Sequence, residues 1–215
     1  MTEQTVYVVD DDQGVRTGLG RSFRGLGYSV QTFPSAERFF EQRTPNGPSC
    51  LVLDLVMPGM PGLEALRRIP GDDSLRTVVL TGYGDVPSAV RAMKSGVVEF
   101  LEKPVKHETL VSAVEEALRQ SEAAVTRARA VMDVRASLAR LTPTEHVVLE
   151  HICAGRATAE IAKLLHRSAR TIEKHRQSVL TKMDAKNAAD LARMVAFLSR
   201  QDRPPFDRER GVDPK

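Results

Sequence analysis

The chain has 215 residues, of which 41% are hydrophobic, enough for two modest domains or for one larger domain. No run approaches the roughly 18 consecutive apolar residues of a membrane span, and the N-terminus lacks the basic and apolar regions of a signal peptide. The two cysteines, Cys50 and Cys153, are too few for a disulfide framework or a metal cluster. We therefore expect a cytoplasmic protein without membrane attachment, in which both cysteines are buried and reduced.

Charge is distributed unevenly along the chain. Residues 1–120 carry 13 Lys and Arg against 16 Asp and Glu, whereas residues 121–215 carry 18 against 12. An acidic first part and a basic second part indicate different binding partners for each. Ordinary surface variation would also fit this difference, so the motifs have to decide between the two interpretations.

Short apolar runs alternate with amphipathic stretches over the first 120 residues. The alternation predicts strands at 5–9, 28–32, 51–54, 77–81 and 98–101, and helices at 13–25, 35–43, 62–69, 85–95 and from residue 106 onward. Strands that alternate with helices form a parallel sheet with both faces covered. We predict that residues 1–120 form an α/β, flavodoxin-like, doubly wound domain with five parallel strands.

Only helices are predicted after residue 120. Residues 121–140 are rich in Ala and Arg and contain no Gly or Pro, which predicts a helical linker that extends the last helix of the first domain. Residues 141–200 are predicted to form an all-α domain of four helices. The charged residues 201–215, which include three prolines, are expected to be disordered.

The boundaries of these four helices carry recognisable signals. Thr142 and Glu145 form a capping-box pattern with Pro143 at the first helical position, which predicts a helix to about residue 154. A short helix at 158–165 and a turn at His166 follow. Ser168 is predicted to cap a helix at 169–183, and Asn187 to cap a last helix to about residue 199.

Carboxylates follow two strands of the predicted sheet. Asp10, Asp11 and Asp12 come directly after the first strand, and Asp54 ends the third. Because parallel strands bring their carboxyl ends to one edge of the sheet, these side chains are expected to lie together. Grouped carboxylates repel one another unless a cation neutralises them, and oxygen ligands without His or Cys favour Mg²⁺.

Two further residues are predicted at the same edge, Thr81 at the end of the fourth strand and Lys103 after the fifth. A hydroxyl, an ammonium and a metal ion around one carboxylate make a site for a phosphoryl group. Asp54 is the natural nucleophile, since a carboxylate can carry a phosphoryl group as an acyl phosphate. Each of these residues alone would fit a cap, a turn or a loop charge, but the set indicates function.

The motifs VVDDDQ, LVLDLVMPGMPG, VVLTGYGD and FLEKP together resemble the receiver domain of two-component response regulators, over roughly residues 4–120. The resemblance implies that Asp54 is the phosphoacceptor and that Mg²⁺ is held by Asp10, Asp11, Asp54 and the backbone carbonyl of Val56. It also implies that Lys103 binds the phosphoryl group, that Thr81 is the switch hydroxyl and that Phe100 is the switch aromatic. Gly82 would leave room for that group, Lys103-Pro104 would be a cis pair, and Asp12 is not expected to be a ligand.

The predicted helix 169–183 has two distinct faces. Ile172, Val179, Leu180 and Met183 share one face and can pack on the preceding helices. The other face carries the candidate DNA-binding side chains Arg170, Glu173, Lys174, Gln177 and Thr181. Arg176 lies toward the core side and is expected to reach a DNA phosphate, whereas His175 is expected to pack. A solvated amphipathic helix would show the same pattern.

The wider pattern LTPTE, GRATAEIAKLL and RTIEKHRQSVLTKM resembles the LuxR-type helix-turn-helix of the NarL/FixJ class of regulators, closest to the FixJ branch, over roughly residues 138–197. The resemblance implies binding to double-stranded promoter DNA. Thr158-Ala159 replaces the Asn-Lys pair that is frequent in this family, which removes one possible phosphate contact. His166 replaces a turn glycine, and histidine tolerates left-handed φ better than most residues, so an intact turn is expected.

The two resemblances together predict a response regulator that is not an enzyme. A partner histidine kinase would phosphorylate Asp54, Phe100 would turn inward, and two chains would dimerise on neighbouring DNA half-sites. A phosphatase with a nucleophilic aspartate is one alternative, but it would need a second acid two residues after Asp54, where Val56 stands. A protein-binding module is the other, and the basic second part favours DNA over it.

Overall fold

The chain, described here as a computed structural model, divides into two compact units between Arg127 and Ala128. The structure describes residues 4–44, 47–69, 74–82 and 86–201. Within these ranges, no helix is both long enough and apolar enough to cross a bilayer. The predicted disorder of the tail falls on residues 202–215, which lie outside the described ranges, whereas Gln201 still belongs to a helix.

The first unit is built on a parallel sheet of five strands, as the sequence predicts. The strands are β1 (Thr5–Val9), β2 (Ser29–Phe33), β3 (Ser49–Leu53), β4 (Leu75–Thr81) and β5 (Glu99–Glu102), in the order β2-β1-β3-β4-β5. β1 and β3 are neighbours, with Val9 opposite Leu53. The residues that follow these two strands therefore emerge side by side at one edge of the sheet.

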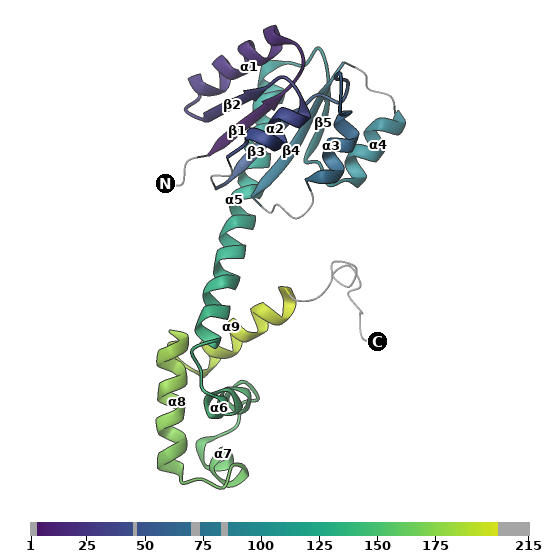
Figure 1. Ribbon diagram of the computed structural model, residues 1–215. Helices are drawn as coiled ribbons and strands as arrows, with labels where there is room; N and C mark the ends of the chain where they lie inside the picture. The colour runs from purple at the N-terminus through teal and green to yellow at the C-terminus, as the bar shows by residue number, and fades with distance from the viewer. Residues whose placement is uncertain (1–3, 45–46, 70–73, 83–85, 202–215) are drawn as a thin grey trace. The chain divides into compact units, whose positions relative to one another are not determined.

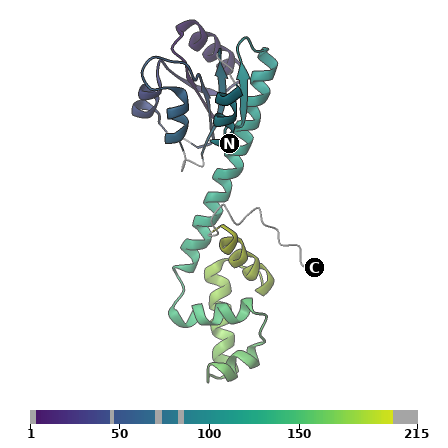
Figure 2. The same cartoon turned by 90° about the vertical axis from the view of Figure 1, so that its right-hand side faces the viewer.

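Helices cover both faces of this sheet (Figures 1 and 2). They are α1 (Gln13–Gly25), α2 (Ala36–Gln42), α3 (Gly62–Arg68), α4 (Val86–Lys94) and the start of α5 (His107–Leu138). One core cluster joins the sheet to α2, α3 and α4 and contains Tyr7, Phe39 and Leu66. The other joins it to α1 and α5 and contains Phe23 and Leu118. β1 and β3 are buried at every position, which explains why their sequence runs are mostly apolar rather than alternating.

Several element boundaries differ from the predicted ones by one or two residues. β3 begins at Ser49 rather than at residue 51 because Ser49 and Cys50 already pair with β1 on one side and with β4 on the other. The Ser49 N–H also donates to the buried Ser121 hydroxyl at 2.9 Å. β5 spans Glu99–Glu102, one residue later than predicted, in register with β4. Helix α4 begins at Val86, and the predicted start at Asp85 lies outside the described residues.

The second unit consists of helices packed around one core. The end of α5 contributes Val134, and α6 (Pro143–Cys153), α7 (Thr158–Leu164), α8 (Ala169–Met183) and α9 (Ala188–Gln201) supply the rest. Helix α5 is unbroken to Leu138, two residues short of the predicted end of the linker helix. The capping box at Thr142 is present. The prediction that Cys153 is buried is wrong: it is half-buried at the end of α6, whereas Cys50 is buried.

Among the described residues other than glycine, two adopt left-handed conformations, one after α7 and one after α8. His166 has φ 51° in the turn between α7 and α8, and the next residue, Arg167, donates its N–H to the Ala162 carbonyl at 3.0 Å. The expected turn is therefore intact, with histidine at the strained position. Asp184 has φ 54° and ends α8, and Asn187 accepts from the N–H of Asp190 at the start of α9.

Candidate functional site

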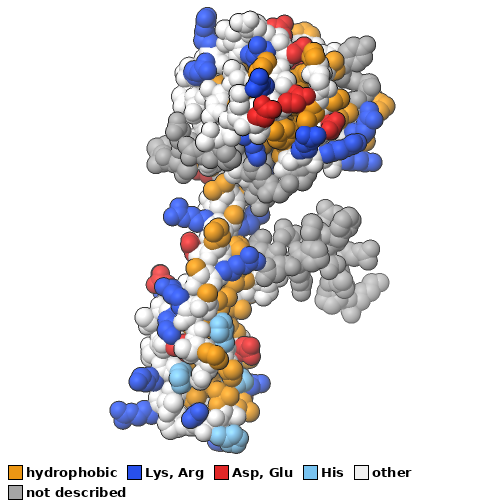
Figure 3. All heavy atoms as spheres, in the orientation of Figure 1, with side chains coloured by type: hydrophobic (Ala, Val, Ile, Leu, Met, Phe, Trp, Pro, Cys, Tyr) orange, Lys and Arg blue, Asp and Glu red, His pale blue; other side chains and the backbone are white. Residues whose placement is uncertain are grey.

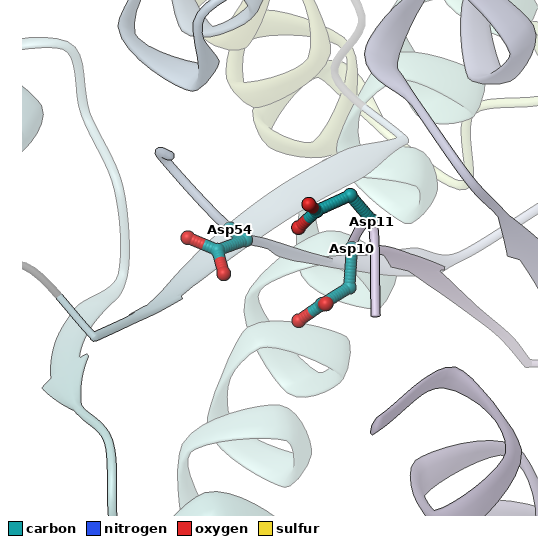
Figure 4. Close-up of side chains that lie close together, drawn as sticks. All are labelled: Asp10, Asp11 and Asp54. Carbon is teal, nitrogen blue, oxygen red and sulfur yellow. The ribbon is translucent and has the colours of Figure 1, made fainter. Parts of the chain in front are cut away.

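Three carboxylates meet where β1 and β3 end. Candidate ligand atoms of Asp10, Asp11 and Asp54 all lie within 4.8 Å of one another, and Figure 4 shows the three side chains gathered at this edge of the sheet. Asp10 is 3% exposed and Asp54 is 6% exposed, while Asp11 faces solvent. The N–H of Asp54 donates to the Val9 carbonyl at 2.9 Å, which fixes the start of the Asp54 loop against β1.

Lys103 brings a positive charge into this cluster. Its Nζ lies 2.6 Å from Asp10 Oδ2 and 2.6 Å from Asp54 Oδ2. Burial alone would lower the pKa of Lys103, but the hydrogen bonds and charges of Asp10 and Asp54 outweigh burial and raise that pKa. Lys103 is positioned by a backbone bond from its N–H to the Thr81 carbonyl, at 2.8 Å. The peptide bond between Lys103 and Pro104 is cis, as expected.

The other acidic residue of the first loop has a structural role. The Asp12 side chain accepts from the N–H groups of Gly14 and Val15 and caps α1. The backbone N–H of Asp12 in turn donates to Asp10 Oδ1 at 2.9 Å. The backbone of Asp12 therefore orients Asp10, whereas the side chain of Asp12 is committed to the helix rather than to the cluster.

The predicted switch residues lie on or next to β4 and β5, the two strands beyond β3 in the sheet. Thr81 is fully buried at the end of β4, and no atom of the described residues lies within 4 Å of the position that a Cβ on Gly82 would occupy. Phe100 lies in β5 opposite Val79 and packs, half-buried, on the core shared with α4. Val56 donates its N–H to Asp54 Oδ1 at 3.0 Å. That its carbonyl is a metal ligand stays a prediction.

Two residues that sequence reasoning missed hold the loop after Asp54. A Cβ on Gly62, at the start of α3, would lie 2.5 Å from the Asp54 carbonyl oxygen. Only glycine therefore allows α3 to begin this close to Asp54. Glu37, on α2, accepts from the N–H of Met60 at 2.5 Å, and the Ser35 hydroxyl, its own N–H and that of Met60 lower the Glu37 pKa. The glycines of the MPGMPG motif were the available signal.

The donor set of the acid cluster fits a hard divalent cation. Carboxylate oxygens, without His or Cys, are the ligands that Mg²⁺ prefers, and Asp10, Asp11 and Asp54 offer three of them within one ion's reach. Lys103 already neutralises part of their charge. The cluster can therefore hold a cation. Beside it, an anionic group could bind, with its charge neutralised by both the cation and the Lys103 ammonium.

In the second unit, α8 presents the two predicted faces. Ile172, Val179 and Met183 are buried and Leu180 is partly buried. The five candidate contact residues Arg170, Glu173, Lys174, Gln177 and Thr181 are all exposed. Figure 3 shows Lys and Arg side chains projecting from the edge of this unit along which α8 runs. His175 is half-buried, as expected for a packing residue. Arg176 is also half-buried, and its Nη1 lies 3.5 Å from the Arg156 carbonyl.

A buried carboxylate fixes α8 against α6. Glu145 is 4% exposed and accepts from the Thr142 N–H at 2.7 Å, the Ser178 hydroxyl at 2.6 Å and Lys182 Nζ at 2.7 Å. Lys182, then Ser178 and the Thr142 backbone, lower the Glu145 pKa to about 2. The capping box was visible in the sequence, but the partners of Glu145 on α8 were not.

Comparison with known proteins assigns a family to each unit. Residues 6–115 match the family model described as response regulator receiver domain, and residues 139–195 match bacterial regulatory proteins, luxR family. The transcriptional regulatory protein FixJ of Rhizobium meliloti is 41% identical over 199 residues, covering 91% of this chain and 96% of that protein. Such relatives are named as transcriptional regulators rather than as catalytic enzymes.

Solved structures agree with these matches. The response regulator StyR is 37% identical and superposes with a TM-score of 0.81, over 90% of this chain and 98% of that one. Full-length FixJ from B. japonicum is 37% identical, with a TM-score of 0.55 over 93% of this chain and 99% of that one. Both likenesses extend over the two units rather than over the sheet domain alone.

Proposed function

Because this chain belongs to the response regulators that join a receiver domain to a LuxR-type DNA-binding domain, we propose that phosphorylation of Asp54 controls its binding to promoter DNA. The observation that carries this proposal is the position of Lys103 Nζ, 2.6 Å from both Asp10 and Asp54. This ammonium contacts both Asp10, a buried candidate metal ligand, and Asp54, the candidate nucleophile. It is therefore suited to bind an oxygen of a phosphoryl group that is transferred to Asp54.

The phosphoryl donor is a phosphohistidine of a partner histidine kinase. A carboxylate oxygen of Asp54 attacks the phosphorus atom, an O–P bond forms, and the P–N bond breaks with its electron pair going to the histidine nitrogen. Mg²⁺, when held by Asp10, Asp11 and Asp54 with the Val56 carbonyl, would neutralise the charge of transfer. Lys103 donates to a phosphoryl oxygen, and the Val56 N–H keeps Asp54 Oδ1 in place.

Thr81 and Phe100 respond to the negative charge of the phosphoryl group on Asp54. Thr81 is buried at the end of β4, next to Gly82, and its hydroxyl moves to donate to the phosphoryl group. Phe100, now half-buried, then turns further inward and changes the surface of α4, β5 and α5. Two exposed apolar side chains on α4, Val90 and Met93, give this surface an area that a second copy can cover.

Paired chains then place two α8 helices on neighbouring half-sites of double-stranded DNA. The exposed side chains Arg170, Glu173, Lys174, Gln177 and Thr181 enter the major groove. Arg176, half-buried, reaches a phosphate. The net positive charge of residues 121–215 supports attraction to the DNA backbone inside the cell.

The test is treatment of the full chain with acetyl phosphate and Mg²⁺, followed by size-exclusion chromatography and gel-shift titration. We expect dimer formation and at least a tenfold gain in DNA affinity. The Asp54→Asn variant should show neither, and the Glu64→Gln variant, which changes an exposed residue of α3, should respond like the wild type. Phosphodonor-dependent dimerisation of Asp54→Asn would contradict the proposal.

A further inference from the structure

The carboxylate of Glu173 on the candidate DNA-binding helix is held from two sides. Thr158, the first residue of α7, donates its hydroxyl to Glu173 Oε2 at 3.1 Å. Gln177, one turn further along α8, donates its amide nitrogen to Glu173 Oε1 at 3.3 Å. Glu173 and Gln177 are exposed and Thr158 is half-buried. A side chain that would otherwise rotate freely on the surface therefore has one anchor on its own helix and one on another.

These two bonds leave the carboxylate able to accept more. An ionised carboxylate offers about four lone-pair positions, and Thr158 and Gln177 occupy one on each oxygen. The Gln177 amide, with its nitrogen turned toward Glu173, keeps its oxygen as an acceptor as well. This part of α8 therefore presents hydrogen-bond acceptors that are held in place. On binding, they would approach DNA, whose phosphates repel negative charge.

A fixed acceptor in the major groove selects bases that donate there. Cytosine presents its N4 amino group in that groove, and carboxylate side chains accept from it. An unanchored Glu173 would turn away from the phosphates and would lose side-chain entropy on binding. The bond from Thr158 removes both obstacles before DNA arrives.

We propose that Thr158 is a positioning residue that holds Glu173 as an acceptor and so makes the domain select cytosine at the base pair that Glu173 faces. This inference rests on the proposed DNA-binding function and adds a determinant outside α8. It also assigns a role to a position where this chain departs from the Asn-Lys pair frequent in its family.

The experiment selects bound sequences from randomised duplexes with the full chain, with and without acetyl phosphate. Glu173→Gln identifies the position that Glu173 reads, since its preference should change there. Thr158→Val and Thr158→Ala remove the anchoring hydroxyl, whereas Thr158→Ser keeps it. Ala159→Val is the control and places a valine at the exposed neighbouring residue of α7. Circular dichroism and the thermal midpoint establish that each variant folds.

For wild type, Thr158→Ser and Ala159→Val, we expect the same preference for cytosine at that position. Thr158→Val and Thr158→Ala should lose about fivefold to tenfold of it, while the preference at other positions and the salt dependence stay unchanged. A preference that survives in both variants, or a loss spread evenly over all positions, would overturn the inference alone. A wild-type chain with no base preference would overturn the proposed sequence-specific function as well.

Discussion

Gly62 lies so close to Asp54 that a methyl group at its Cα would come within 2.5 Å of the Asp54 carbonyl oxygen and 2.6 Å of the Leu55 Cα. Both atoms belong to backbone that cannot rotate away, so a side chain there must displace the loop that carries the candidate nucleophile. The start of α3 is therefore part of the site, although Gly62 has no group that could react.

Replacement of Gly62 by alanine should weaken both the fold and the reaction. We expect a loss of about 1–3 kcal/mol in the free energy of unfolding, the usual cost of overpacking, and slower phosphorylation by acetyl phosphate. Urea denaturation and intact-mass kinetics measure the two effects. The matched control is Gly18→Ala in α1, where a Cβ meets nothing within 4 Å, and which should stabilise the chain by about 0.5–1 kcal/mol. Equal behaviour of the two variants would contradict this role of Gly62.

Replacing the adjacent acids of the first loop should have different effects on Mg²⁺ affinity. Asp10→Asn and Asp11→Asn should each lower Mg²⁺ affinity at least tenfold, because they remove candidate ligands. Asp12→Ala should change Mg²⁺ affinity little and should cost about 1 kcal/mol of stability, because Asp12 caps α1. Isothermal titration calorimetry decides between these outcomes, and a large loss of affinity in Asp12→Ala would show that it is a ligand.

The ion pair between Glu145 and Lys182 should stabilise the second unit in a pH-dependent way. Because the Glu145 pKa is lowered from 4.5 to about 2, its contribution is complete above pH 4.5 and is lost as the pH falls toward 2. Lys182→Met should cost about 2 kcal/mol, since it leaves a buried carboxylate without its cation. Lys163→Met, on the exposed side of α7, should cost little.

Urea unfolding of the full chain, followed through methyl NMR signals of Val148 and Ile172, measures this contribution. The difference between wild type and Lys182→Met should shrink between pH 4.5 and pH 2. A difference that is the same at both pH values would mean that the charge of Glu145 is not responsible.

Among the exposed cations of α8, Lys174 should contribute to DNA affinity through a phosphate at the groove wall rather than through a base edge. Lys174→Ala should weaken binding to specific and random duplexes to a similar extent and should reduce the salt slope by about one. Arg119→Ala, an exposed cation of α5 paired with Glu116, removes the same charge from the first unit. It should leave the salt slope unchanged, and an equal effect of the two variants would mean that net charge alone matters.

Periodicity and motif order were sufficient to predict the helices and strands, the parallel sheet and the residues of the acid cluster. Local signals also worked where the interaction is local, as with the Thr142 capping box and the left-handed His166. What could not be predicted depends on contacts between distant segments. Ser49 donates to the Ser121 hydroxyl across 72 residues of chain, and Lys182 meets Glu145 across 37.

The same limit applied to the glycines and to Thr158. The sequence shows that Gly62 follows a Pro-Gly-rich loop, but not that the Asp54 backbone lies against it. Thr158 was noticed only as a missing phosphate contact, because its bond to Glu173 forms when α7 and α8 pack together. Cys153 was expected in the core from its type alone, and the end of α6 leaves it half-buried.

The most direct test of the account is to locate the phosphoryl group. The full chain is treated with acetyl phosphate and Mg²⁺, the acyl phosphate is reduced with borohydride to homoserine, and peptides are sequenced by mass spectrometry. We expect homoserine at position 54, dependent on Mg²⁺ and absent in Asp54→Asn. Homoserine at Asp10, Asp11 or another acid, or the same yield after chelation of Mg²⁺, would contradict it.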